Sequence, residues 1–525
     1  MRFDLLTRPW IPVVDLAGER REVSLARLIL GAHQFRRIVA EAPPMTAALH
    51  RLVLAVMHRA YAPRDDEQWS ELWSRRRLPF APLHAYLTEH RARFDLLDQD
   101  RPFLQCPKLG VKAWSSAAKL VPFRASGNNV TLFDHTTDAE TVALPLAEAA
   151  RWLVTAQAFD PGGMKTPFDK DKSSERAPCN YFGVVVVEGA TLRETLLLNT
   201  HEYSPDDERP PMTGPDDRPA WEDPQAPRAE PDLRPPLGWT DLLTWPSRRI
   251  LLGASEHDGR PVVDKVVITP GVRLRSQLPE VELMAAFRQP TLNGKPKKDA
   301  PLLPVRLREV RGVWRHSVEL LLAGDDRTRR RPRMLDQIAT LAEHGHLPDD
   351  TVYTLRIFGQ QLDKNNAVVE SWAEEEILAP VALLRARDAS VSNLLGYAVK
   401  LADDVGDALR ALERDHRGDM RGEPASTIDL DYWPRLPSPF AEFTRTLGAA
   451  LRAGGENATA VQGWATAVRA AARTAADLWA EGSPRQGRNL LTAGKQHVRF
   501  TGRLETIIAV YRAHSAASIT QEHTA

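Results

Sequence analysis

The chain is poor in cysteine, carries no net charge and lacks any long apolar run. Its two cysteines, Cys106 and Cys179, are too few for a disulfide framework or a four-thiolate zinc site. We expect both to be reduced thiols of an intracellular protein. No charged leader with an apolar core opens the sequence, and no stretch of about 20 apolar residues follows. A soluble, cytoplasmic protein without a membrane span is therefore expected.

The charge balance excludes one class of nucleic-acid binder. Lys plus Arg and Asp plus Glu each number 69 in 525 residues. A protein that coats nucleic acid by net charge would be basic, so any contact must come from local patches. Apolar residues make up 43% of the chain, which is enough for buried cores. The length alone allows about two to four domains.

Catalytic motifs are also absent. The sequence contains neither the phosphate-binding GxxxxGK[ST] pattern nor the metalloprotease HExxH pattern. His257-Asp258 lies in a turn-like Glu-His-Asp-Gly context, and His344-Gly345-His346 is best interpreted as a surface loop. Glu374-Glu375-Glu376 is interpreted as a solvated helical face. Nothing unites a nucleophile, a base and an orienting group, so we predict no enzyme, no metal and no cofactor.

The first 370 residues mix short helices and strands. Ser24 should begin a first helix over 24–30, and apolar residues at helical spacing predict a helix over 45–61. The β-branched run 184–187 predicts a buried strand. Residues 203–238 carry ten prolines, so this segment is expected to be a surface excursion between core elements.

Further strands are expected after the proline-rich segment, and the composition then changes. The strand-like runs cover 250–252, 262–268 and 352–358. From about Pro380, four Ala-, Leu- and Arg-rich segments predict helices, joined by loops with Gly and Pro. They cover 381–412, 440–451, 458–479 and 489–511. The expected fold is therefore α+β: a mixed α/β domain over 1–378, followed by an all-α four-helix bundle over 379–525.

Basic residues gather locally in several places. Arg327–Arg333 is the densest run, and Gly162-Gly163 precedes a basic segment, Lys165–Lys172, that contains Phe168. Four cations follow one face of the last helix. A phosphate-tracking stripe would have this spacing, and so would an ordinary solvated face. The four are Arg488, Lys495, Arg499 and Arg503.

Several short motifs, taken together and in order, resemble the CasA family. They are Phe3–Leu6 (FDLL), Pro9–Val13 (PWIPV), Arg101–Gln105 (RPFLQ), Leu132–His135 (LFDH) and Pro161–Gly163 (PGG). This family is the large subunit of the type I-E CRISPR surveillance complex, Cascade. The resemblance implies a non-catalytic subunit that recognises the protospacer-adjacent motif (PAM) in double-stranded target DNA. It also implies help with target unwinding and R-loop formation, and a docking surface for the helicase-nuclease in antiviral defence.

The family contacts the PAM from the minor groove with three elements. The glycine-rich loop corresponds to Gly162, Gly163, Met164 and Lys165. The wedge hairpin corresponds to Gln360–Ala367, which includes Lys364, with Asn365-Asn366 at its tip and Gln360-Gln361 as a competing register. The basic finger corresponds to Arg273 or Arg275. Minor-groove recognition is degenerate, so the resemblance implies tolerance of several PAM sequences.

The resemblance also implies protein and RNA partners. Asn128–Ala143 is similar to the family loop that docks on the 5′ handle of the guide RNA and on a neighbouring backbone subunit. It holds Leu132, Phe133, Asp134 and His135; Phe133 could stack on a base or pack in a local core. Handle-binding and small subunits are further implied partners, with the bundle touching DNA. Two other hypotheses remain: a stand-alone metal-dependent nuclease, and a pure structural scaffold that never touches DNA.

Overall fold

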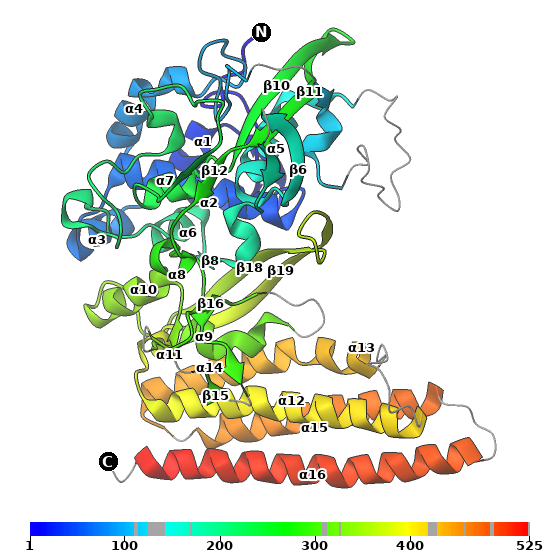
Figure 1. The fold of residues 1–525 in the computed structure, drawn as a ribbon. Helices are drawn as coiled ribbons and strands as arrows, with labels where there is room; N and C mark the ends of the chain where they lie inside the picture. The colour runs from blue at the N-terminus through cyan, green and yellow to red at the C-terminus, as the bar shows by residue number, and fades with distance from the viewer. Residues whose placement is uncertain are drawn as a thin grey trace.

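The computed structural model consists of a mixed α/β part and a layer of long helices beside it (Figure 1). It describes residues 1–109, 114–123, 142–168, 171–292, 295–297, 299–306, 312–324, 327–417, 428–455, 457–482 and 488–522. Across these ranges, no helix is both long enough and apolar enough to cross a bilayer.

The α/β part is organised around one buried helix, α2 (Pro43–Tyr61). Every residue from Pro44 to His58 is buried, and the helix packs against α5 and α7. The first helix begins at Ser24, whose hydroxyl accepts a hydrogen bond from the Arg27 amide. The helices of this part are α1 (Leu25–Leu30), α2, α3 (Asp66–Ser74), α4 (Phe80–Glu89), α5 (Leu146–Phe159), α6 (Leu192–Leu198), α7 (Trp239–Leu243), α8 (Leu278–Val281), α9 (Ser317–Leu321), α10 (Arg333–Glu343) and α11 (Val381–Arg385).

The strands form several small sheets. Strands β1 (Ile11–Asp15), β2 (Arg20–Val23) and β3 (Phe35–Ile38) pair in the order β2-β1-β3. Strands β10 (Arg248–His257), β11 (Arg260–Pro270), β4 (Ser115–Ser116) and β5 (Leu144–Pro145) form a second sheet, and β8 (Val184–Glu188), β18 (Val352–Leu362) and β19 (Val369–Pro380) a third, ordered β19-β18-β8. The shorter pairings are β9 (Asp232–Arg234) with β12 (Val272–Leu274), β6 (Gly163–Phe168) with β7 (Asp171–Ser174), β14 (Thr291–Leu292) with β15 (Lys295–Pro296), and β13 (Phe287–Arg288) with β16 (Leu303–Pro304) and β17 (Arg329–Arg330).

The expected α+β fold is confirmed, and the local predictions of the first 370 residues agree with it. The helices predicted over 24–30 and 45–61 are α1 and α2, and the run 184–187 lies in the wholly buried β8. The other three predicted strand runs lie in β10, β11 and β18. Periodicity and β-branching therefore suffice wherever an element faces one core.

The proline-rich segment 203–238 is more than an excursion over the surface. It contains only 3-10 turns and the short β9, as its prolines require. However, Trp221 is buried, with ring centroids 5.2 Å from Phe94 and 6.1 Å from Phe103. The buried Asp217 carboxylate accepts hydrogen bonds from the Thr240 amide and hydroxyl, both at 2.9 Å. The segment thus contributes side chains to the core.

The prediction of a helical face at Glu374-Glu375-Glu376 is wrong. These residues lie in β19, which pairs along its length with β18. Glu374 accepts a hydrogen bond from Arg356 at 3.0 Å, and Glu375 accepts one from the Val313 amide at 2.5 Å. Because each carboxylate finds a partner from another segment, three consecutive acids are compatible with a strand.

Four long helices form the predicted bundle: α12 (Ala389–Arg417), α14 (Pro437–Ala453), α15 (Ala458–Gly482) and α16 (Arg488–Glu522), with the short α13 (Ile428–Tyr432) beside them. The helix predicted over 381–412 is divided into α11 and α12. Asp388 causes the division by accepting a hydrogen bond from the Ser390 amide at 2.8 Å, as an N-capping side chain does.

An aromatic cluster joins the bundle to the α/β part. Trp314 lies in the 3-10 turn Val313–His316, and its ring centroid is 4.7 Å from Phe440 and 5.7 Å from Trp464. Beside it, Arg315 donates to Asp403 of α12 at 2.7 Å. The turn is held to β19 by the bond between Val313 and Glu375, so the junction is continuous with the β18–β19 hairpin.

Three buried histidines should make the fold sensitive to mild acid. Burial lowers the pKa of His50 and of His58 to about 4, and that of His201 to about 3, from 6.5. Below about pH 6.5 these histidines bind protons in the unfolded chain but not in the folded chain. Their contribution to the unfolding free energy is therefore full above that pH and is lost as the pH falls. We expect a loss of about 1.4 kcal/mol per pH unit for each histidine. Denaturant unfolding between about pH 7 and pH 5 measures this; an unchanged midpoint would contradict it.

Candidate nucleic-acid interface

The tip of the β18–β19 hairpin is a six-residue turn, 363–368, held by one carboxylate. Asp363 Oδ1 accepts hydrogen bonds from the amides of Ala367 at 2.7 Å and Val368 at 2.9 Å. These bonds lower the pKa of Asp363, the Val368 amide having the largest effect. Asn366 adopts a left-handed conformation, φ 56°, which Asn tolerates better than most residues. The turn leaves Lys364 and Asn365 exposed.

The competing register, Gln360-Gln361, lies in β18 and outside this turn. The Gln360 amide nitrogen donates to the Phe159 carbonyl and to Asn180 Oδ1, each at 2.9 Å, and its oxygen accepts from Trp372 at 3.0 Å. Gln360 is therefore engaged inside the protein. Gln361 is exposed and donates only a long bond, 3.4 Å, to Glu370.

The glycine pair, Gly162 and Gly163, contacts this hairpin tip. The Gly162 amide donates to the Asn366 carbonyl at 2.7 Å. A Cβ at Gly162 would lie 3.2 Å from backbone atoms of Ser174, Arg176 and Asn366. Gly163 has φ +100°, and a Cβ there would lie 3.3 Å from the Ala367 side chain. Glycine at 162 thus allows the close backbone approach, and glycine at 163 allows the left-handed backbone conformation. The next residue, Met164, is 75% exposed.

A buried charge cluster fixes the start of the glycine loop. Asp160 Oδ2 lies 2.7 Å from Lys165 Nζ and 2.5 Å from Arg248 Nε. Burial would raise the pKa of Asp160, but the two cations more than offset it and lower the pKa overall. Burial lowers the pKa of Lys165, partly offset by Asp160. Arg248 also donates to the carbonyls of Pro161 at 2.9 Å and Glu175 at 2.7 Å. The Lys165 charge is thus engaged inside the protein.

Arg176 connects the hairpin tip to a groove that reaches the predicted basic finger. Its guanidinium donates to Asn366 Oδ1 at 2.9 Å and lies 3.8 Å from the centre of the Tyr181 ring. A cavity of about 360 Å³ begins at this point. Arg176, Tyr181, Trp245, Arg248, Arg273 and Arg306 are among the residues that line it. Arg273 is exposed in β12, whereas Arg275 is exposed just beyond it and does not line the cavity.

The structure therefore brings two of the predicted site elements into contact, and a groove connects the third to them. The glycine loop contacts the hairpin tip directly, and Arg273 faces the same groove as Arg176. Sequence reasoning missed Asp160, Arg176 and Arg248, which position these elements. Only Asp160 left a local signal, as an acid immediately before Pro161-Gly162-Gly163 with a lysine five residues on.

The stripe on the bundle and the arginine run behave differently. Lys495, Arg499 and Arg503 are exposed on α16, and none forms an ion pair within the described chain; the side chain of Arg488 lies outside the described set. In the arginine run, Arg331 is buried and donates to Asp336 and to the carbonyls of Leu321 and Leu384, all at 2.7 Å. Much of that run is therefore structural.

The predicted docking loop lies outside the described residues, because 124–141 include Leu132, Phe133, Asp134 and His135. The residue before it is described: Phe123 is half exposed, with ring centroids 5.6 Å from Trp152 and 5.7 Å from Trp372. Phe123 therefore packs near the tip end of the β18–β19 hairpin, where Trp372 pairs with Gln360. His257-Asp258, at the far end of the β10–β11 hairpin, is the exposed turn that was expected.

This fold is shared with CRISPR-associated proteins. The family model described as CRISPR-associated protein Cse1 matches residues 4–475. The CRISPR-associated protein CasA/Cse1 of Thermus thermophilus is 33% identical over 533 residues, covering 95% of both chains. The crystal structure of Thermobifida fusca Cse1 is 29% identical with a TM-score of 0.82, covering 97% of this chain and 98% of that one. The chain belongs to the Cse1 family, also called CasA, the family of the large Cascade subunit.

A chain in a structure described as a CRISPR RNA-guided surveillance complex has the same fold. It matches with a TM-score of 0.72 at 21% identity and covers 96% of this chain and 99% of that chain. The family resemblance inferred from the short motifs is confirmed over nearly the whole chain by the family model and by the Thermus thermophilus relative.

Removing the central carboxylate should loosen the glycine loop. Asp160→Asn leaves the buried Lys165 and Arg248 charges without their anion, which should cost about 3–5 kcal/mol of unfolding free energy. Thermal and denaturant unfolding measure the change. The matched control is Asp404→Asn, because Asp404 forms an exposed pair with Lys400 at 2.8 Å and should cost at most about 1 kcal/mol. Equal losses in the two variants would contradict the assigned role.

Proposed function

We propose that this chain is the non-catalytic large subunit of a type I-E Cascade and recognises the PAM in double-stranded DNA. One observation carries the proposal: the glycine loop contacts the tip of the β18–β19 hairpin, and Arg176, which is bonded to Asn366 of that tip, lines the same groove as Arg273. In this proposal, three elements from distant parts of the sequence present backbone, amide and guanidinium groups to one duplex. Membership of the Cse1 family supports the assignment of these groups to PAM recognition.

The chemistry of these groups suits the minor groove. Base pairs present acceptors there, and guanine adds one amino donor. Exposed Asn365 and Lys364 can donate to the acceptors, and the loop carbonyls around Gly163 can accept from the guanine amino group. Asn366 and Lys165 are held by Arg176 and Asp160, so their proposed role is to position the tip and the loop. Such a tip, inserted beside the PAM, would help unstack the first base step and start R-loop formation.

The remaining partners follow from family membership. The segment 124–141 is proposed to dock on the 5′ handle of the guide RNA and on a backbone subunit, beginning at the anchored Phe123. The exposed cations of α16 are proposed to follow the DNA backbone. The proposed role is intracellular. It includes contacts with the handle-binding and small subunits and a docking surface for the helicase-nuclease.

The PAM assignment is tested by DNA binding of guide-loaded Cascade. Gel shifts with target duplexes with and without a PAM would compare complexes lacking this chain, containing it, and containing Asn365→Ala or Arg273→Ala. We expect the preference for the PAM to appear only with the chain and to fall about tenfold in each variant, as for a lost base contact.

The control for the hairpin is Gln361→Ala, an exposed amide in the same hairpin but outside the turn. It should bind like the unchanged chain. If Gln361→Ala loses the preference and Asn365→Ala keeps it, the wedge uses the other register. If complexes with and without the chain bind equally, the chain is a scaffold and the proposal fails.

The role of the stripe is tested by the salt dependence of DNA binding. Affinity falls with salt concentration, so the slope of log affinity against log salt is negative. Arg499→Glu should reduce the magnitude of this slope by about one, because one phosphate contact is lost. PAM preference should not change. Arg452→Glu, the same charge change on an exposed arginine at the end of α14, is the control and should leave the slope unaltered. If both changes alter the slope equally, the cations of α16 make no specific phosphate contact, and the effect reflects only the net charge of the chain.

A further inference from the structure

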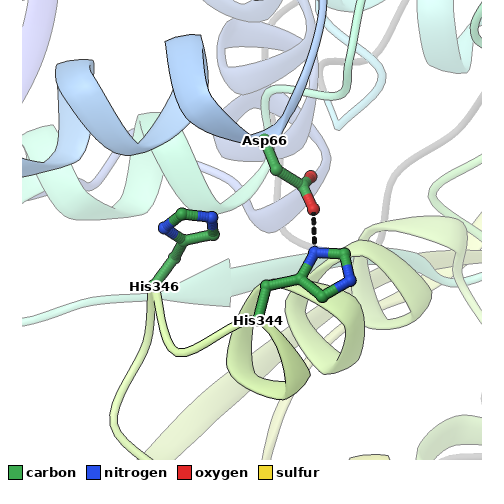
Figure 2. Close-up of side chains that lie close together, drawn as sticks. All are labelled: Asp66, His344 and His346. Carbon is green, nitrogen blue, oxygen red and sulfur yellow. Dashed lines mark hydrogen bonds and ion pairs between the residues drawn. The ribbon is translucent and has the colours of Figure 1, made fainter.

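Two histidines and an aspartate from distant segments meet at the surface (Figure 2). One nitrogen of His344, one nitrogen of His346 and one carboxylate oxygen of Asp66 all lie within 4.8 Å of one another. Across the described ranges, this is the one group of three or more His, Cys, Asp and Glu side chains that comes so close. The sequence indicated a surface loop at His344-Gly345-His346 but gave no sign of Asp66, 278 residues away.

The two histidines are positioned by the end of α10. His344 is the C-capping residue, and Gly345 follows with φ +78°. The Gly345 amide donates to the Ala342 carbonyl at 3.1 Å, and the His346 amide donates to the Leu341 carbonyl at 2.8 Å. This pair of bonds is the Schellman motif, which closes a helix through a left-handed glycine. The histidines therefore flank a fixed turn, and their approach to each other does not depend on a flexible loop.

Asp66 is positioned by the start of α3. The capping role belongs to its neighbour Asp65, whose carboxylate accepts from the Gln68 amide at 2.8 Å. Asp66 is thereby left to face the histidines, and its Oδ2 lies 2.7 Å from His344 Nδ1. Asp66 is only 9% exposed. A carboxylate held in this way is oriented as metal ligands are.

We propose that Asp66, His344 and His346 bind a first-row divalent transition metal of the zinc type. Two imidazoles and one carboxylate are donors that zinc accepts, whereas magnesium and calcium prefer oxygen ligands alone. Three protein ligands leave one tetrahedral position for water, as the exposure of His344 allows. Ligand atoms about 2.0–2.2 Å from such an ion stand roughly 3.3–3.6 Å apart. Small rotations of the two histidines bring the three atoms to that spacing.

The bound metal ties the start of α3 to the end of α10. Both elements lie on the side of the α/β part away from β6 and the β18–β19 hairpin in Figure 1. The occupancy of the site can therefore be tested apart from DNA recognition. Because metal competes with protons for imidazole, binding weakens in mild acid.

Cobalt(II) titration of the full, tag-free chain, stripped with a chelator and dialysed, tests the site. We expect one ion per chain with the visible absorption of a four-coordinate cobalt site, displaced by one equivalent of zinc. His346→Ala and His344→Gln should each weaken cobalt binding by about tenfold or more. Zinc should raise the thermal unfolding midpoint of the unchanged chain and raise it less in both variants. Unfolding without metal verifies that the variants fold.

The matched control is His497→Ala. His497 also pairs with an aspartate, its Nε2 lying 2.9 Å from Asp477 Oδ1, but belongs to no cluster of three ligands among the described residues. This variant should keep the cobalt spectrum and the affinity of the unchanged chain. The proposal is overturned if the unchanged chain gives no four-coordinate cobalt spectrum. It is also overturned if His346→Ala binds as tightly as His497→Ala, which would indicate scattered surface binding.

Discussion

The candidate interface depends on one buried carboxylate, that of Asp160. A charge leaves water at low cost only when partners surround it, and here Lys165 and Arg248 lie within 2.7 Å. Arg248 begins β10 and binds the carbonyls of Pro161 and Glu175, so the same network holds both ends of the β6–β7 hairpin. The glycine loop can then present its backbone to the hairpin tip in one conformation. Adjacent glycines alone would leave that loop poorly defined.

Much of the fold was predictable because its signals are local. Helix α2 follows from apolar spacing, α1 from Ser24, and the bundle from four Ala- and Leu-rich segments separated by Gly and Pro. The failures share one cause. Three consecutive acids at 374–376 show neither helical nor strand periodicity, and their cationic and amide partners come from other segments of the chain. Arg331 likewise lies in the densest basic run of the sequence, but it is buried against the carbonyls of Leu321 and Leu384.

The candidate site was predictable only in part, and for the same reason. Gly162, Asn366 and Arg273 were found through family resemblance, since no local pattern links residues so far apart. The structure adds what resemblance did not provide: Arg176 joins the tip to the groove, and Asp160 engages Lys165. Exposure then divides the predicted residues by role. Asn365 and Lys364 face solvent, whereas Asn366 and Lys165 are bonded inward.

The hairpin is connected to the bundle through packed and hydrogen-bonded side chains. Strand β19 runs from the hairpin tip to Pro380, and on the way Glu375 holds the turn that inserts Trp314 among bundle aromatics. In the proposed function, a minor-groove contact at the tip and a backbone contact on α16 are then made by one connected frame. The second contact forms at a high effective concentration once the first exists. Neither contact needs high affinity by itself. The chain can therefore leave most duplexes quickly and still bind tightly where both contacts form.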